Sequence, residues 1–427
     1  MESKTTNTMK RILLFLFFAL TVSLLTGCDS LTKAPDDTTP EEYVPVGGSG
    51  PIQLRAALLP QVSRDNAFAL NLFRTMAANS GDSNIIISPL SISIALGMAW
   101  NGANGETKAE MSGMLGTNGM ADSLVNQYYE VMQKSLPVVD SSTVVNLANS
   151  LWYAPDFIVK PTYLKLNQDY FDTEIRKIDF HQTKAKDTIN AWVDTKTNHL
   201  IDQILNATDD ERMILINAVY FKGAWVDPFN PQKTYSGTFT KQNGGTKPIN
   251  MMSMLDTLRY GEDTYAQYLD LPYGNGAYSM TVVLPKSGKT TTTVLNALTL
   301  ESLNTMIGSL TLQKVSVNLP RFKVACDFSL VKPLKALGMN LAFTDIADFS
   351  SISEEPVMIS NILHKTFVEV TEKGTKAAAV TAILFETTSA MPDFPFFIVD
   401  KPFLFFIREN GTKTILFAGK VGDIENF

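Results

Sequence analysis

The sequence is poor in the residues that build metal and redox sites. Its 427 residues include two cysteines and three histidines. Two cysteines allow at most one disulfide and exclude a four-cysteine zinc site. The three histidines lie too far apart for a short His-x-x-x-His motif. Lys and Arg number 36 against 43 Asp and Glu, a net charge of −7, which excludes a globally basic nucleic-acid binder. We therefore expect no metal, no cofactor and no nucleic-acid partner.

Motifs of catalysis are also scarce. The sequence contains no Gly-x-Ser-x-Gly elbow and no Gly-x-x-x-x-Gly-Lys phosphate loop. Ser-x-x-Lys occurs twice, at Ser30 and at Ser329, and Lys286-Ser287-Gly288 resembles the late motif of penicillin-binding enzymes. That late motif must follow the nucleophile, whereas here it precedes Ser329. A surface-anchored serine hydrolase is therefore only a remote alternative.

The N-terminus has the pattern of an export signal. Lys10 and Arg11 precede an apolar run of 14 residues, Ile12 to Leu25, which is short for a membrane span and typical of a signal-peptide core. The run ends in Leu25-Thr26-Gly27-Cys28, which resembles the lipobox of bacterial lipoproteins. We expect a signal peptide over 1–27 and lipidation of Cys28, so that the exported protein is anchored to a bacterial membrane. The alternative is an ordinary secretory signal and a secreted protein.

The rest of the chain divides into a tether and one domain. Residues 28–58 are rich in Pro, Gly, Asp and Thr and predict a flexible tether. Residues 59–427 are predicted to form one domain, because they contain no repeat and no second linker. A buried helix is expected over Leu90–Trp100, a second helix over Ile189–Ile204, and a hairpin around Asn410-Gly411. Helices early and strands late favour an α+β fold.

The most informative stretch is 364–403. Lys365–Val370 alternates like a strand, a run of small residues follows Gly374, and Ala382–Ser389 again has strand composition. We expect no tight turn between the first strand and the small residues. Met391-Pro392 then ends the pattern.

The sequence resembles the serpin family over the whole body, in many ordered blocks at family spacing. The blocks are Asn84–Ile92, Asn149–Trp152, Ile216–Trp225, Phe343–Ser350, His364–Ala379 and Asp400–Ile407. The resemblance implies a fold of three β-sheets and about nine helices with an exposed reactive-centre loop, about 374–395. It implies a monomeric suicide inhibitor of serine, and in some members cysteine, proteases and not an enzyme. The cleaved loop would insert into the main sheet and trap the protease as an acyl-enzyme.

The resemblance also assigns the reactive bond. Counting 14 residues from Gly374 places the bait residue at Thr388 and the cut at Thr388-Ser389. Counting back from Asp400 leaves the range from Glu386 to Met391 open. Small residues in this range favour elastase-like or subtilisin-like proteases. The absence of Lys and Arg between Val380 and Asp400 argues against a trypsin-like target.

Two further groups are assigned by the resemblance. The hinge that begins insertion comprises Glu372, Gly374, Thr375, Ala377, Ala378 and Ala379, and its small inward residues favour an inhibitor. A non-inhibitory serpin that binds a ligand or chaperones a client is the alternative.

A polar cluster beneath the sheet comprises Ser88, Asn217 and His364, and Glu372 is expected to pair with Arg321 beside Trp225. Lys134 is the one basic residue between Ala109 and Val159, so we expect no heparin-type cofactor.

Overall fold

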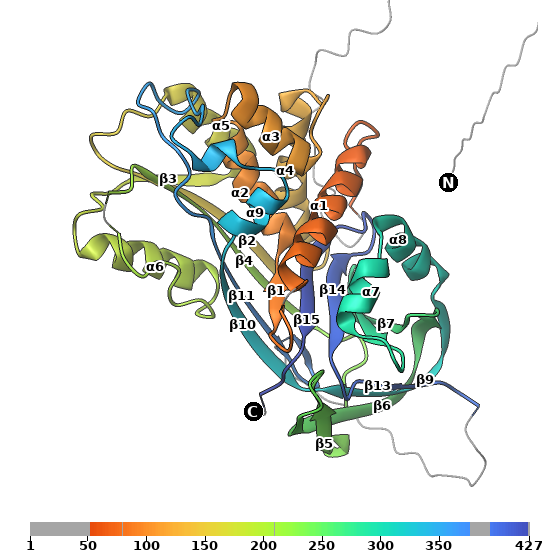
Figure 1. Cartoon of the computed structure of the whole chain (residues 1–427). Coiled ribbons are helices and arrows are strands. Elements are labelled where there is room, and N and C mark those ends of the chain that lie inside the picture. The colour runs from red at the N-terminus through yellow and green to blue at the C-terminus, as the bar shows by residue number, and fades with distance from the viewer. Residues whose placement is uncertain (1–51, 79, 209, 376–392, 426–427) are drawn as a thin grey trace, which may run out of the picture. The chain divides into compact units, whose positions relative to one another are not determined.

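A computed structural model describes residues 52–78, 80–208, 210–375 and 393–425 (Figure 1). These residues form nine α-helices and three hydrogen-bonded sheets, which confirms the predicted α+β class. The helices are α1 (Leu59–Ala77), α2 (Pro89–Trp100), α3 (Gly105–Leu115), α4 (Asp122–Ser135), α5 (Pro161–Phe171), α6 (Lys184–Lys196), α7 (Thr291–Ala297), α8 (Leu300–Ser309) and α9 (Val331–Ala336). None of the helices in these ranges is long and apolar enough to cross a membrane.

The largest sheet has nine strands and supplies much of the core. In spatial order they are β1 (Ile85–Ile87), β15 (Ile415–Val421), β14 (Phe403–Glu409), β8 (Tyr278–Pro285), β7 (Ala266–Tyr273), β6 (Thr246–Glu262), β9 (Thr311–Pro320) and β13 (Phe396–Ile398), with β5 (Tyr235–Thr240) paired to β6. Every residue of β8, β14 and β15 is buried, as expected for central strands covered on both faces. The predicted hairpin around Asn410-Gly411 is confirmed, since β14 and β15 pair antiparallel on either side of it.

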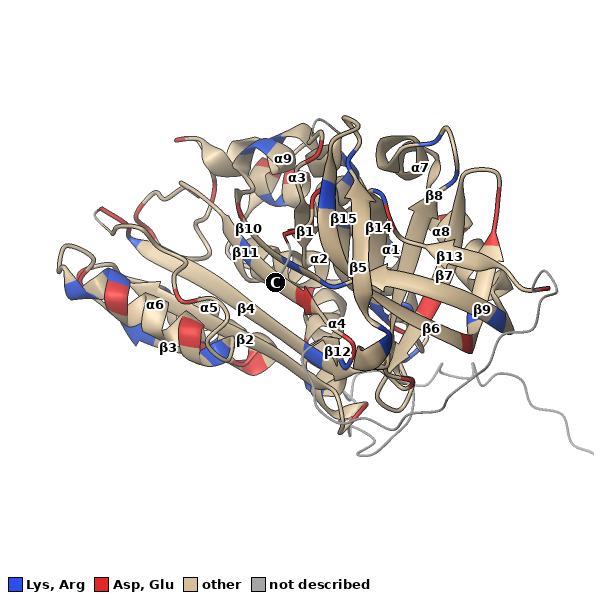
Figure 2. Ribbon diagram, turned by 90° about the horizontal axis from the view of Figure 1, so that it is seen from below, with Lys and Arg blue, Asp and Glu red and all other residues tan. Residues whose placement is uncertain are grey.

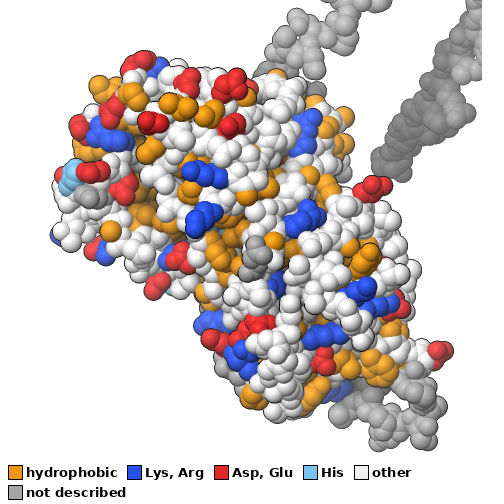
Figure 3. Space-filling model, viewed as in Figure 1, with side chains coloured by type: hydrophobic (Ala, Val, Ile, Leu, Met, Phe, Trp, Pro, Cys, Tyr) orange, Lys and Arg blue, Asp and Glu red, His pale blue; other side chains and the backbone are white. Residues whose placement is uncertain are grey.

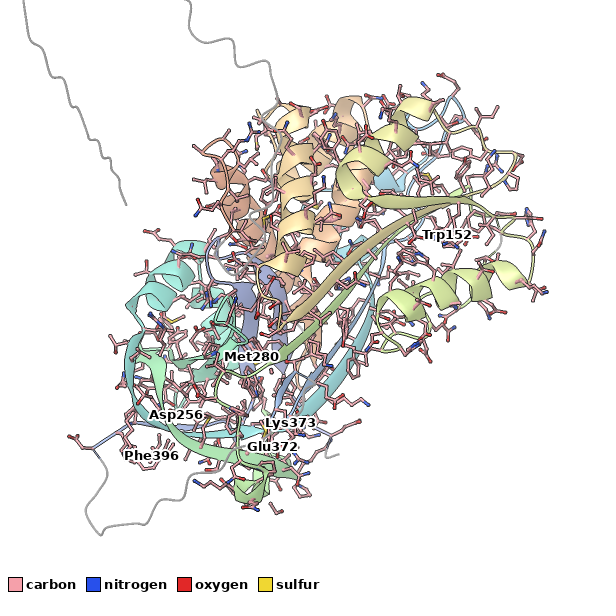
Figure 4. All side chains as sticks on the ribbon, turned by 180° about the vertical axis from the view of Figure 1, so that it is seen from behind. Trp152, Asp256, Met280, Glu372, Lys373 and Phe396 are labelled. Atoms are coloured by element: carbon pink, nitrogen blue, oxygen red, sulfur yellow. The ribbon has the colours of Figure 1, made fainter. Side chains whose placement is uncertain are left out.

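Two smaller sheets run alongside each other. One holds β3 (Thr173–Lys177), β2 (Val144–Tyr153), β4 (Met213–Ala224) and β12 (Gly374–Thr375), and the other holds β10 (Phe322–Ser329) and β11 (Leu363–Val370). Figures 1 and 4 show β4 and β11 next to each other. Over the described residues no ladder joins these two strands, and the short β12 pairs with the end of β4 instead.

Helices cover the smaller sheets on different sides. The predicted helix over Leu90–Trp100 is confirmed as α2, which is almost wholly buried and contacts β4 and β15. Ser88 is at the N-cap position, but its hydroxyl makes no capping hydrogen bond. On another side α6 contacts β4, and Figure 2 shows both basic and acidic residues along this helix, as on a solvated face.

The predicted helix over Ile189–Ile204 is wrong in its second half. Helix α6 ends at Lys196, and Asn198 and His199 then adopt positive φ angles of 53° and 62°. The chain reverses there, and the side chain of Asn190 accepts hydrogen bonds from the backbone N–H groups of Ile204 and Leu205, both at 2.9 Å. Residues 204–205 therefore fold back against the helix, and the helical spacing of the apolar residues after Lys196 does not correspond to a longer helix.

Candidate functional site

The predicted hinge begins with a tight turn, contrary to the sequence expectation. Thr371 donates its backbone N–H to the carbonyl of Gly374 at 3.0 Å, and Gly374 donates back to Thr371 at 3.1 Å. Glu372 and Lys373 form the two-residue loop between them. The chain therefore reverses directly after β11, and Gly374 and Thr375 pair antiparallel with Ala224 and Gly223 of β4. Figure 4 shows Glu372 and Lys373 at one end of the sheet and Trp152 of β2 near the other.

Gly374 makes this reversal sterically feasible. Its φ is +121°, a conformation that side-chain-bearing residues rarely adopt. A Cβ placed on Gly374 would lie 2.3 Å from the carbonyl oxygen of Gly223 and 2.8 Å from the backbone nitrogen of Trp225. Both the backbone angle and the close approach to β4 therefore require glycine at this position.

Thr375 is buried against Tyr273 at the end of β4. It is 5% exposed, and its hydroxyl hydrogen-bonds the hydroxyl of Tyr273 at 2.9 Å. The ring of Tyr273 stacks on Trp225 with ring centroids 4.3 Å apart. Gly223 leaves the space for this ring, because a Cβ there would lie 2.7 Å from it. Burial raises the pKa of Tyr273, so the phenol keeps its proton for this contact.

Glu372 is held from two sides. Arg321 donates from Nε to both carboxylate oxygens of Glu372, at 2.8 and 2.9 Å, and Thr234 donates its hydroxyl to the same carboxylate. Burial alone would raise the pKa of Glu372, but these hydrogen bonds outweigh it and hold the pKa below its usual value. Trp225 donates from its indole N–H to the carbonyl of Thr371 at 3.0 Å. The structure thus brings Glu372, Arg321 and Trp225 together around the turn.

The polar cluster beneath the sheet is split in two. His364 Nε2 accepts a hydrogen bond from the backbone N–H of Ser88 at 3.0 Å, which places the ring proton on Nδ1. Asn217 instead accepts from Ser91 and donates to Asn149 at 2.6 Å. No hydrogen bond between these described side chains joins His364 to Asn217. Burial lowers the pKa of His364 to about 4, so the imidazole is neutral at pH 7.

Sequence reasoning missed Tyr273, Gly223, Thr234, Ser91 and Asn149 as members of these sites. Tyr273 is 102 positions from Thr375, so no local pattern connects them. Several predicted residues lie outside the described residues: Cys28, Ala377, Ala378, Ala379 and the reactive bond Thr388-Ser389 with its range from Glu386 to Met391.

The chemistry of the remaining candidates does not support a hydrolase. Ser329 donates its hydroxyl to the amide oxygen of Asn361 at 2.6 Å, and an amide cannot act as a general base. Within the described ranges no three His, Cys, Asp or Glu side chains converge as a metal-binding group.

Comparison with known proteins agrees with this arrangement. Residues 63–424 match the family model described as Serpin (serine protease inhibitor). Iripin-1 of Ixodes ricinus is 34% identical over 371 residues, which cover 84% of this chain and 94% of that protein. Leukocyte elastase inhibitor of Sus scrofa is 34% identical over 378 residues, covering 85% and 99%.

Two solved structures have the same fold. The thermophilic serpin tengpin in its native state has a TM-score of 0.79 and 31% identity, covering 88% of this chain and 96% of its own. Human thyroxine-binding globulin complexed with its hormone has a TM-score of 0.79 and 28% identity, covering 87% and 100%. The chain therefore belongs to the serpin family, a family of serine protease inhibitors rather than of enzymes.

Proposed function

We propose that this chain is a suicide inhibitor of serine endopeptidases that traps its target as a covalent acyl-enzyme. The observation that carries this proposal is the seating of Gly374 and Thr375 beside the end of β4. These two residues are the first two positions of a strand that would run antiparallel to β4. That strand would insert between β4 and β11, which are not paired by backbone hydrogen bonds over the described residues.

The register of β12 extends this argument along the loop. Because Gly374 pairs with Ala224, Ala377 would meet Phe221, Ala379 would meet Val219, and Phe385 would meet Met213, the first residue of β4. Directly paired residues share a face of the sheet, so the small hinge residues would face inward with the buried Phe221 and Val219. The predicted bait residue Thr388 would lie three positions after Phe385, beyond the Met213 end of β4.

The energy of insertion supports an irreversible trap. Burying Ile383 and Phe385 would contribute about 1.5–3 kcal/mol each. Roughly ten new ladder hydrogen bonds would add about 0.5–1.5 kcal/mol each. At about 3.3 Å per residue, 15 inserted residues would carry the cut end roughly 50 Å, with the attached protease. The uncleaved form would then be held kinetically and not at its free-energy minimum.

We propose elastase-like or subtilisin-like proteases as targets, and cysteine proteases as a further class. The support is the small residues at the predicted bond, Thr388 and Ser389, together with the absence of Lys and Arg between Val380 and Asp400. The protein would act as a monomer.

The test is covalent trapping. The full chain is mixed with neutrophil elastase, pancreatic elastase, subtilisin, trypsin and papain and separated on a denaturing gel. We expect a band at the summed mass that survives boiling, with cleavage at Thr388-Ser389 by mass spectrometry. Ala377→Pro should turn the inhibitor into a substrate, because proline removes a ladder donor. Cleavage without a complex for every protease would indicate the non-inhibitory alternative.

We further propose that the protein is anchored to a bacterial membrane through lipidated Cys28. The support is the Leu25-Thr26-Gly27-Cys28 sequence after the apolar run. Cys28→Ser should abolish incorporation of labelled palmitate and release the protein from the membrane fraction. Cys326→Ser is the matched control, because burial raises the pKa of the Cys326 thiol to about 11 and keeps it unreactive. Label retained in Cys28→Ser would refute the anchor.

A further inference from the structure

An apolar patch covers the outer face of the sheet where the chain continues after the loop. In β13, Phe397 is buried while Phe396 is 50% and Ile398 is 39% exposed. On the neighbouring strand β9, Leu312 is 66% exposed. Single exposed apolar side chains are common on protein surfaces, but neighbouring ones call for an explanation.

Contacts between the strands make these side chains one surface. Phe394 lies beside Phe396 with ring centroids 5.8 Å apart, and the ammonium group of Lys314 lies 5.6 Å from the ring of Phe394. Leu312 and Lys314 alternate onto the same face of β9. We call the surface formed by Leu312, Phe394, Phe396 and Ile398 the β13 patch. Figure 3 shows hydrophobic side chains in the region of β9 and β13, and Figure 4 shows Phe396 at the outer edge of the domain.

Residues paired across the strands connect the patch to β9 and β6. Ser316 pairs with Phe396 on one side and with Leu255 of β6 on the other, so these three residues form a row across three strands. Among the strands formed by the described residues, β13 is also the last in the order of its sheet. Edge strands usually carry charge that discourages pairing, yet β13 consists of Phe396, Phe397 and Ile398. An uncharged apolar edge fits a surface that another protein covers.

The position of the patch identifies the occupant. Phe394 follows Ser389, the residue after the predicted bond, by five positions. Since a residue spans at most about 3.3–3.6 Å, Phe394 lies within roughly 20 Å of the bond. A standard interface covers about 800 Å² on each partner, which is a disc of radius about 16 Å. The two lengths are comparable, so a protease centred on the bond would cover the Phe394 end of the patch wherever residues 389–394 span less than about 16 Å.

We propose that the β13 patch is a docking surface for the target protease, whose apolar surface beyond its primed subsites packs on Leu312, Phe394, Phe396 and Ile398. This proposal rests on the proposed inhibitory function. Burial of exposed aromatic side chains is a common source of binding energy at interfaces. The patch would select among proteases that accept the same loop, because loop and patch must be engaged together.

The test separates docking from insertion. The variants are Leu312→Ala/Phe396→Ala in the full chain, with Ile158→Ala/Ile346→Ala as the matched control, since Ile158 and Ile346 are 81% and 71% exposed elsewhere on the surface. For each protease that the wild type traps, the association rate constant and the stoichiometry of inhibition are measured. Binding to the same protease with its active-site serine replaced by alanine gives the docking affinity alone.

We expect the patch variant to associate at least tenfold more slowly and to bind the inactive protease at least tenfold more weakly. Its stoichiometry should stay within twofold of wild type, because the hinge is unchanged, and the control variant should match wild type throughout. Wild-type rates in the patch variant would overturn the docking surface while leaving the inhibitory function intact. The docking surface would also be overturned if the patch substitutions only converted a dimer of this chain into monomers and left the association rate constants unchanged. If the wild type traps no protease, the inhibitory function fails and the docking surface fails with it.

Discussion

Replacing Gly374 by alanine tests whether the seated hinge starts insertion. The added Cβ would lie 2.3 Å from the oxygen of Gly223, so Gly374 and Thr375 would have to leave β4. This loses the pairing with β4 and the hydrogen bond between Thr375 and Tyr273. At about 0.5–1.5 kcal/mol for each hydrogen bond, the loss is about 2–4 kcal/mol. Because the seated hinge must then be formed against this clash, a cost of that size would slow the first step of insertion by roughly 30-fold to 1000-fold.

The assay is the stoichiometry of inhibition together with the gel. Slower insertion lets the protease hydrolyse the acyl-enzyme, so Gly374→Ala should be cleaved mostly as a substrate. The matched control is Gly338→Ala, because Gly338 also has a positive φ, +101°, but nothing within 4 Å of its added Cβ. Both variants share the backbone strain, so a difference between them isolates the clash at β4. Wild-type stoichiometry in Gly374→Ala would refute the reasoning.

Two further predictions concern the hinge anchor and cofactors. Glu372→Gln removes the charge that Arg321 binds, and losing charge-assisted hydrogen bonds of about 1.5–3 kcal/mol should lower the melting temperature, whereas exposed Glu301→Gln should not. Heparin should not accelerate inhibition, because Lys134 is the one basic residue of α4 and pairs with Glu130 at 2.6 Å. Faster inhibition with heparin in progress curves, or strong retention on heparin-Sepharose, would contradict this prediction.

The sequence predicted those elements that depend mainly on residues close together in the chain. The apolar character of 90–100 predicted a buried helix, and Asn410-Gly411 predicted a hairpin, because both depend on neighbours in the chain. The turn after β11 escaped the same reasoning. Glu372 and Lys373 are not turn formers, and the reversal depends on Gly374 fitting against a strand 150 residues earlier.

The exposure of one face of β13 could not be predicted from the sequence either. Phe394-Pro395-Phe396-Phe397-Ile398-Val399 contains no polar residue, and such a run is typical of a strand buried on both faces. Phe396 and Ile398 are exposed while Phe397 is buried, because successive side chains point to opposite faces and only the inner face of β13 is covered. The composition of a strand therefore does not reveal its place in a sheet.

The burial of Asp65 on α1 was also not predicted from the sequence, and it leads to a prediction about how stability depends on pH. Burial raises its pKa to about 7, although hydrogen bonds from Gln61 and Tyr129 oppose the rise. Because its usual pKa is 3.8, the folded protein binds more protons than the unfolded chain between these values, and stability falls as pH rises from about 4 to 7. His364 acts in the opposite direction between pH 4 and 6.5, since its folded pKa is lowered.

The two titrations should nearly cancel in the wild type from pH 4 to 6.5, and Asp65→Asn should separate them. Its neutral amide removes the cost of ionising Asp65, about 4 kcal/mol, so the variant should melt higher than wild type at pH 8 and similarly at pH 4. Of the two titrations only that of His364 then remains, so the melting temperature of the variant should rise between pH 4 and 6.5. Asp202→Asn, at an exposed position, should follow wild type. A variant that gains nothing at pH 8 would refute this reasoning, because Asp65, which is only 4% exposed, would then ionise in the folded protein without cost.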